Sequence, residues 1–157
     1  MSEREITVGV ISDTHGLLRP QAVAALRGSD IIIHAGDVGN PDVIEALAGV
    51  APTFAVRGNV DTAAWAADLP VTELVEVGAR WFFVLHEISQ LDLDPATAGF
   101  AAVVFGHSHQ PLIETRAGVL FLNPGSAGPR RFSLPIAVAR VAVSDAGMRP
   151  EIVELQV

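Results

Sequence analysis

The chain has 157 residues, half of them hydrophobic, which is enough to build one domain with a substantial core. It has no cysteine, and all ten of its basic residues are arginine. This composition excludes disulfides, thiolate nucleophiles and the lysine of a Walker-type phosphate loop. Eighteen acidic residues give a net charge of −8, which argues against a duplex-nucleic-acid partner. We expect a single domain over residues 1–157.

The N-terminal segment MSEREITVGVIS carries acidic residues and leads directly into a strand pattern. A signal peptide would instead begin with a basic segment and end at a small-residue cleavage site. No apolar run approaches the ~18 residues that a membrane helix needs. These features predict a soluble cytoplasmic protein without a membrane partner.

The first 60 residues predict alternating strands and helices. Apolar, β-branched runs typical of strands buried on both faces occupy 6–11, 31–33 and 52–56. Between them, helices that begin at a proline and are followed by a glycine are predicted over 20–26 and 41–48. This alternation predicts a parallel sheet with right-handed crossovers.

The second half of the chain predicts antiparallel pairs. Three hairpins with glycine-containing turns are expected, formed by 74–77 with 80–85, 112–115 with 119–122, and 135–143 with 148–155. A further buried strand is predicted over 101–105. Together the elements predict an α/β domain in which two mixed sheets form a sandwich with helices outside.

Polar side chains follow the predicted strands, and all five histidines lie at or just past the end of an apolar run. Because the carboxyl ends of strands line the ligand crevice of open α/β sheets, we expect these side chains to converge. One such histidine is more often a hydrogen-bonded loop residue than a ligand. A cluster of carboxylates and imidazoles is costly, however, unless a cation compensates it. Without thiolates, the site suits Mn, Fe, Zn, Ni or Co.

The candidate ligands are Asp13, His15, Asp37, Asn59, His86, His107 and His109. Seven ligands are too many for one ion, whereas two ions ~3.5–4 Å apart that share a carboxylate would use them all. Asp37 is the expected bridge, because it lies on the middle loop of the predicted β-α-β-α-β unit. His34 either orients a ligand or is a hydrogen-bonded strand-end residue, and Asp61 either bonds a ligand histidine or shapes a turn.

Five short motifs occur in a fixed order along the chain: D-x-H at 13–15, G-D at 36–37, G-N-x-D at 58–61, a strand-end histidine at 86, and G-H-x-H at 106–109. In this order and at these places in the strand pattern, the chain resembles the calcineurin-like metallophosphoesterase superfamily. It is most similar to the small, single-domain YfcE-type phosphodiesterases. The resemblance extends from about residue 6 to residue 155 and implies a four-layer fold, with helices flanking two mixed sheets.

The resemblance also implies a role for each candidate. One ion would be held by Asp13, His15 and His109, the other by Asn59, His86 and His107, with Asp37 bridging them. Asp37, Asn59 and His107 would be the catalytic residues, and Asn59 would also bind the substrate. Arg57 either neutralises the phosphate of the substrate or is a solvated or ion-paired arginine. The cofactors would be two divalent ions per chain, with Mn²⁺ expected first and Fe, Ni, Zn or Co as alternatives.

Two positions depart from the pattern of the family. Val60 follows Asn59, where many members have a histidine, and valine cannot transfer a proton. Glu87 and Ile88 follow His86, where the family usually has glycine and a further histidine. A carboxylate near the phosphate would repel anionic substrates. These differences leave the expected metal ligands and the hydrolytic reaction unchanged, but they can alter which phosphoesters the site accepts.

The expected function is a dinuclear metal-dependent phosphodiesterase, in which a hydroxide bridging the two ions attacks phosphorus in line. Diesters with acidic leaving alcohols should react best, because no general acid stands at Val60. The alternatives are a phosphomonoesterase or nucleotide phosphatase and, outside the enzymes, a protein-binding scaffold such as a retromer subunit of this fold. We expect a small phosphoester as the ligand, and exposed hairpin edges are compatible with a homo-oligomer.

Overall fold

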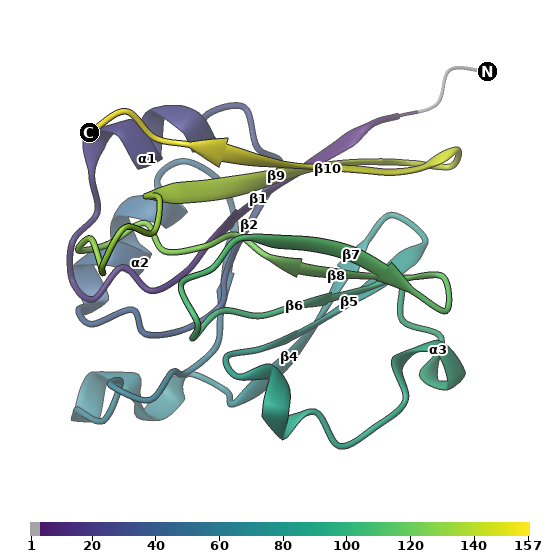
Figure 1. Cartoon of the computed structure of the whole chain (residues 1–157), viewed down its shortest axis with the longest axis horizontal. Helices are drawn as coiled ribbons and strands as arrows, with labels where there is room; N and C mark the ends of the chain where they lie inside the picture. The colour runs from purple at the N-terminus through teal and green to yellow at the C-terminus, as the bar shows by residue number, and fades with distance from the viewer. Residues whose placement is uncertain (1–3) are drawn as a thin grey trace.

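Two five-stranded sheets, stacked against each other, form the centre of the computed structural model, which describes residues 4–157 (Figure 1). The first sheet has the order β10-β9-β1-β2-β3. Its strands are β1 (Ile6–Ile11), β2 (Ile31–His34), β3 (Thr53–Ala55), β9 (Ala137–Ser144) and β10 (Gly147–Glu154). The neighbours β1, β2 and β3 run parallel, and β9 and β10 add an antiparallel hairpin beside β1.

The second sheet has the order β4-β5-β6-β8-β7. Its strands are β4 (Thr72–Val77), β5 (Arg80–Leu85), β6 (Ala102–Val104), β7 (Leu112–Arg116) and β8 (Val119–Asn123). The central strands β5, β6 and β8 run parallel, and the edge strands β4 and β7 are antiparallel to their neighbours. Both sheets are therefore mixed, as the sequence predicts.

Alternation along the strands separates the core into layers. Val8, Val10 and Ile33 of the first sheet pack between the sheets against residues such as Phe82 and Leu122 of the second. The other face of the first sheet packs against helices α1 (Pro20–Leu26) and α2 (Pro41–Ala48). Because both faces of the parallel strands are covered, these strands read as continuous apolar runs in the sequence.

The outer face of the second sheet has a thinner cover than the resemblance implies. Val103, Phe105 and Phe121 on this face pack against Ile88 and Leu91. The covering segment contains a short 3-10 helix, η2 (Ile88–Gln90), and the four-residue helix α3 (Pro95–Ala98). The fourth layer is thus mostly irregular chain. In the described residues 4–157, no helix is long and apolar enough to cross a membrane.

Candidate metal centre

The loops that follow the parallel strands of both sheets meet at one end of the sandwich. Asp13 and His15 follow β1, and Asp37 follows β2. His86 directly follows β5, and His109 lies in the loop after β6. The first sheet therefore supplies carboxylates and one histidine, and the second sheet supplies imidazoles, as expected for the carboxyl ends of parallel strands.

Two groups of side chains each bring three potential ligand atoms within 4.8 Å of one another. The first group is Asp13, His15 and His109, and the second is Asp13, Asp37 and His86. Asp37 Oδ2 lies 3.2 Å from His86 Nε2 and 3.7 Å from His15 Nε2, so it faces a histidine of each group. Asp13 belongs to both groups, and a bridging role for Asp37 stays a prediction that this geometry supports.

Several polar atoms of this cluster are buried without a hydrogen-bond partner. They are Asp13 Oδ1, His15 Nε2, His86 Nε2 and His109 Nδ1. Buried polar atoms are normally satisfied, since each unsatisfied one costs about 1–3 kcal/mol. Lone pairs from two carboxylates and three imidazoles are the donor set of a divalent transition metal. The residues present therefore fit the ions that the sequence predicts.

The orientation of His86 leaves one nitrogen free for a metal. Its Nδ1 donates a hydrogen bond to the carbonyl oxygen of Ala35 at 2.7 Å. In a neutral imidazole the other nitrogen then carries a lone pair, and His86 Nε2 is the atom that faces Asp37. A backbone carbonyl that fixes the tautomer in this way is typical of metal-binding histidines.

The two carboxylates are held in their ionised form. Burial raises the pKa of Asp37, but the contact with the His86 imidazole and a hydrogen bond from the N–H of Val60 outweigh it and bring the pKa to about 2. Burial also raises the pKa of Asp13, and contacts with His109 and Ser12 outweigh it, so that its pKa is lowered. Burial lowers the pKa of His86, but the contact with Asp37 and the charge of Asp13 outweigh burial, so that the pKa of His86 is raised. The cluster is thus built around two anions that attract positive charge.

The backbone at the cluster is strained. Among residues 4–157, seven non-glycine residues have a positive φ, and five of them are candidate ligands. These five are Asp13, His15, Asp37, His107 and His109, with φ between 47° and 72°. Left-handed conformations of non-glycine residues are uncommon and concentrate at functional sites. The loops therefore use unfavourable backbone angles to direct these side chains inward.

Two glycines let the loops approach each other at the cluster. A Cβ on Gly106 would lie 2.6 Å from Asp13 Oδ2 and still closer to Ser12 Oγ. A Cβ on Gly58 would collide with the backbone nitrogen and the carboxylate of Asp37. Each glycine precedes a candidate ligand in its own loop and contacts a candidate ligand of another loop. The G-N and G-H motifs thus have a steric cause.

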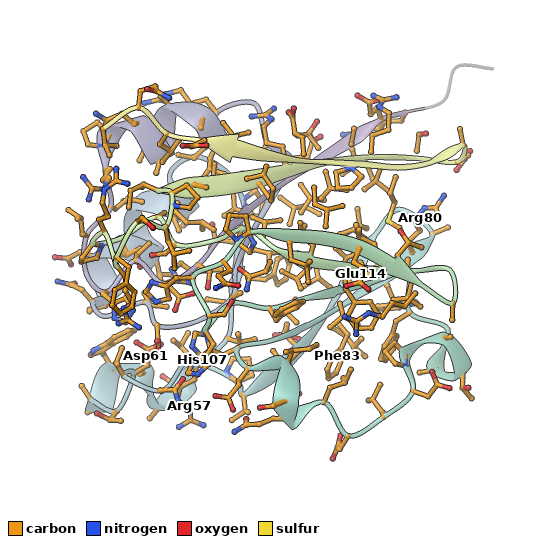
Figure 2. The ribbon with its side chains drawn as sticks, in the orientation of Figure 1. Arg57, Asp61, Arg80, Phe83, His107 and Glu114 are labelled. Carbon is orange, nitrogen blue, oxygen red and sulfur yellow. The ribbon has the colours of Figure 1, made fainter. Side chains whose placement is uncertain are left out.

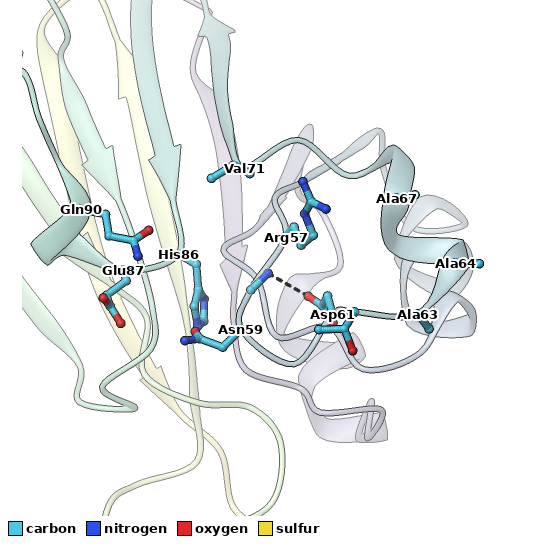
Figure 3. A pocket seen from close by; sticks show the side chains of 12 residues that line it. Arg57, Asn59, Asp61, Ala63, Ala64, Ala67, Val71, His86, Glu87 and Gln90 are labelled. Carbon is cyan, nitrogen blue, oxygen red and sulfur yellow. Dashed lines mark hydrogen bonds between the residues drawn. The ribbon is translucent and has the colours of Figure 1, made fainter.

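Asn59 and His107 lie beside the two ligand groups without belonging to either. His107 is 44% exposed, and its ring meets that of His86 edge-on with the centroids 5.3 Å apart. Its backbone N–H donates to Asp13 Oδ2 at 3.1 Å. Asn59 lines the same cavity as His86 (Figure 3). Both residues are placed next to the cluster, and their roles as ligands stay predictions.

Asp61 shapes turns and makes no hydrogen bond to a candidate ligand side chain. Its carboxylate accepts hydrogen bonds from the backbone N–H groups of Val38, Gly39 and Gly58, at 2.9 to 3.1 Å. Asp61 is 2% exposed and joins the loop after β2 to the loop after β3. Of the two sequence alternatives for Asp61, the structure favours the turn residue.

His34 is the histidine that the cluster does not use. It is fully buried, and Thr14 Oγ1 donates to the carbonyl of Val38, so the hydroxyl can only accept from His34 Nε2. His34 Nδ1 then accepts from the N–H of Gly36 at 3.1 Å. Burial lowers the pKa of His34 to about 4. His34 is therefore a neutral, hydrogen-bonded strand-end residue that supports the loops carrying Asp13 and Asp37.

Two polar residues at the carboxyl end of β8 also support the cluster, and neither was predicted to be a site residue. Asn123 Nδ2 donates to the carbonyl of Gly106 and to Ser108 Oγ, both at 3.1 Å. Ser126 Oγ donates to the carbonyl of Asp13 at 3.1 Å. Both residues are buried, Asn123 as the last residue of β8 and Ser126 in the turn that follows, so they lie at the carboxyl end of a parallel strand like the candidate ligands.

A cavity of about 510 Å³ opens beside the cluster (Figure 3). His86, Asn59, Glu87 and Gln90 line one part of it, and Arg57 lines another. Small side chains, among them Ala63, Ala64 and Ala67, complete the lining. Arg57 and Asp61 lie at the same end of the molecule as His107 (Figure 2). The cavity can hold a ligand next to the candidate metal ligands.

Two stacked mixed sheets with a buried cluster of carboxylates and imidazoles at one end define an α/β metal-binding protein. The chain belongs to the calcineurin-like phosphoesterase superfamily, because the model of that domain matches residues 6–146. A relative named a probable metallophosphoesterase, from Methanothermobacter thermautotrophicus, is 33% identical over 147 residues, which cover 85% of each chain.

Two further comparisons differ in what they support. A phosphodiesterase from Methanocaldococcus jannaschii is 28% identical over 136 residues, which cover 75% of this chain and 82% of the relative. The solved structure of vacuolar protein sorting 29 from Cryptosporidium parvum has a TM-score of 0.78 at 19% identity, covering 96% of this chain and 97% of that one. This second likeness shows the shared fold alone.

Proposed function

We propose that this protein is a dinuclear metal-dependent phosphodiesterase. The observation that carries the proposal is the buried cluster in which the unpartnered Nε2 atoms of His15 and His86 face the ionised carboxylates of Asp13 and Asp37, with His109 beside them. Two divalent ions in such a site would polarise phosphoryl oxygens and lower the pKa of a shared water. The phosphodiesterase among the relatives supports a diester as the substrate class.

Each candidate residue has a proposed role in binding the metal ions or the substrate. Asp13, His15 and His109 would hold one ion, Asn59, His86 and His107 would hold the other, and Asp37 would contribute a ligand to both. Asn59 also donates a hydrogen bond to a phosphoryl oxygen, since its side chain reaches the cavity beside His86. Mn²⁺ is the expected ion, because carboxylate and amide-oxygen ligands suit it, and the imidazole ligands make Fe, Ni, Zn or Co the alternatives.

The cavity favours a diester over a monoester. Among the described residues 4–157, Arg57 is the only arginine that lines it. A phosphodiester has one negative charge, whereas a monoester has up to two at neutral pH, and the second charge needs more cationic contacts. Val60, half exposed beside Asn59, offers no proton to a poor leaving group. The diester is therefore the better substrate.

The test compares an aryl phosphodiester, bis(4-nitrophenyl) phosphate, with 4-nitrophenyl phosphate on protein stripped of metal and reloaded with Mn²⁺. We expect metal-dependent hydrolysis, with a higher kcat/KM for the diester. His107→Ala should lower the kcat for the diester by about 100-fold or more, beyond the loss expected for an outer-shell residue. Gln110→Ala, which changes an exposed neighbour in the same loop, is the matched control.

Faster turnover of the monoester would replace the proposed substrate class with the monoesterase alternative. Protein that binds two ions but hydrolyses neither ester, whichever of Mn²⁺, Fe²⁺, Co²⁺, Ni²⁺ or Zn²⁺ is bound, would instead support a scaffold role. Full activity of His107→Ala would contradict the role of that histidine.

A further inference from the structure

Glu87 makes a direct contact with a candidate metal ligand. Its Oε1 lies 2.9 Å from His107 Nε2. Its other oxygen, Oε2, accepts a hydrogen bond from Ser89 Oγ at 2.8 Å. The Glu87 side chain is 25% exposed and that of His107 is 44% exposed, so the contact is partly open to solvent. Both oxygens of the carboxylate therefore have a partner within the protein.

The contact determines which nitrogen of His107 can bind an ion. An ionised carboxylate only accepts hydrogen bonds, so the proton lies on His107 Nε2. In the neutral imidazole, Nδ1 then carries the lone pair. A metal ion binds a lone pair, and so the orientation that Glu87 stabilises presents Nδ1 as the ligand atom.

The place of the ring agrees with this assignment. Nδ1 is bonded to Cγ and lies on the main-chain side of the imidazole, whereas Nε2 lies at its far side. The main chain of His107 is held at the cluster, because its N–H donates to Asp13 Oδ2 at 3.1 Å with a φ of 72°. The ring also packs edge-on against His86. The main-chain hydrogen bond and the ring contact hold His107 beside the cluster, while its Nε2 is directed to Glu87.

We propose that Glu87 is a positioning residue for the second metal ion, an inference that rests on the proposed dinuclear centre. Glu87 accepts a hydrogen bond from the Nε2–H of His107. This bond fixes the tautomer and the ring orientation, and it makes Nδ1 a better electron-pair donor to a metal ion. This role differs from the effect expected from the sequence, where Glu87 repels anionic substrates. A carboxylate that accepts from an imidazole and a hydroxyl has part of its charge compensated.

The experiment measures metal binding rather than activity. Metal-free wild-type protein is titrated with Mn²⁺ by calorimetry, alongside Glu87→Ala and Glu87→Gln. We expect two ions for the wild type. In Glu87→Ala the affinity for one ion should fall by about 10- to 100-fold while the other is unchanged, as for loss of an outer-shell partner. Glu87→Gln should lie between them, because its amide oxygen still accepts from Nε2.

Glu114→Ala is the matched control. Glu114 is an exposed carboxylate on β7 that also has a partner at 2.9 Å, Arg116, and it lies away from His107 (Figure 2). The control removes the same charge, so a general electrostatic loss of metal affinity would appear in both variants. Thermal unfolding of metal-free Glu87→Ala and wild type checks that the fold is retained.

A second measurement tests the assignment of the nitrogen. In ¹⁵N-histidine NMR spectra of the metal-free protein, His107 should carry its proton on Nε2, and diamagnetic Zn²⁺ should perturb its Nδ1 resonance. His107→Gln assigns the signal. Equal affinities of wild type and Glu87→Ala for both ions, tighter binding by Glu87→Ala, or Zn²⁺ on Nε2 would each overturn the inference. Fewer than two ions in the wild type would instead overturn the dinuclear centre itself.

Discussion

His34 shows how a single buried side chain can couple the stability of the fold to pH. It is fully buried, and its two ring nitrogens bond to Thr14 Oγ1 and to the N–H of Gly36. Protonation would place a second hydrogen on Nδ1, which now accepts a hydrogen bond. Burial therefore lowers the pKa of His34 to about 4, from an ordinary value of 6.5.

The sign of the effect follows from proton linkage. Between pH 6.5 and pH 4 the unfolded chain binds a proton at His34 and the folded chain does not, so acid favours unfolding. When the pH is lowered from 7 to 4.5, protonation of His34 in the unfolded chain should reduce the free energy of unfolding by about 2–3 kcal/mol. In His34→Gln, which does not titrate, the fall over this pH range should be smaller by that amount.

The measurement is urea unfolding of the metal-free proteins at a series of pH values. Asp13, Asp37, Asp61 and His86 also act on His34, but they are present in both proteins and cancel in the comparison. An identical pH dependence for wild type and variant would contradict the low pKa of His34.

At the scale of elements, the loops after the strands depend on close contacts between main chains. Gly58 belongs to the loop after β3 and lies against Asp37 in the loop after β2. Asp61 joins the same two loops through three backbone N–H groups. The positions of Asp37 and Asn59 are therefore set jointly by these two loops.

Gly58→Ala should separate these loops while leaving the strands in place. Its Cβ would meet the backbone nitrogen and Oδ1 of Asp37, so one loop must shift. We expect Mn²⁺ affinity to fall by about 10-fold or more and the free energy of unfolding to fall by about 1–3 kcal/mol. Calorimetric titration and urea unfolding measure the two effects.

Gly99→Ala provides the comparison for this variant. Gly99 has a φ of 83° with open space around it, at the C-terminal end of α3 and outside both ligand groups. Alanine there should cost about 1 kcal/mol through the backbone alone and leave Mn²⁺ affinity unchanged. Unchanged metal binding in Gly58→Ala would show that the loop contact does not position the ligands.

The elements themselves differ in how well the sequence predicts them. All ten strands and the helices α1 and α2 lie within two residues of the predicted ranges, because each forms a long apolar run or has a clear start and stop. The helices η1 (Ala64–Asp68), η2 and α3 were not predicted. In α3, the cap Asp94 and the terminal Gly99 are so close together that no periodicity can develop between them.

At the scale of the whole molecule, the candidate centre joins the two sheets. Asp13, His15 and Asp37 follow strands of the first sheet, whereas His86 and His109 follow strands of the second. An ion that binds both sets can do so only in the folded chain, since residues so distant in sequence are separated on unfolding. Metal binding is therefore coupled to the stability of the sandwich.

Mn²⁺ should raise the melting temperature. One site stabilises the fold by about 2.7 kcal/mol when the free metal is at 100 times its Kd. For a chain of this size, each kcal/mol shifts the melting temperature by about 2–4 °C, so we expect a rise of about 5–10 °C. Calorimetric scans with Mn²⁺ and with a chelator measure it. The rise should vanish in Asp13→Asn; a rise of equal size in that variant would place the stabilising ion elsewhere.

The sequence by itself determined the order of the ten strands and of helices α1 and α2, because apolar periodicity and the proline and glycine signals are local. It also determined which seven side chains are candidate ligands, because each follows a strand whose carboxyl end faces a common edge. The buried pairing of Asp13 with His15, His109, Asp37 and His86 agrees with that expectation.

Only the tertiary structure decided how residues on different loops meet. In the folded chain, Asp61 accepts hydrogen bonds from three backbone N–H groups, His34 forms hydrogen bonds with Thr14 and Gly36, and Glu87 contacts His107. Each of these contacts depends on distances of a few ångströms between loops or within a tight turn. Such distances follow from the packing of the two sheets, which the order of residues along one strand does not specify.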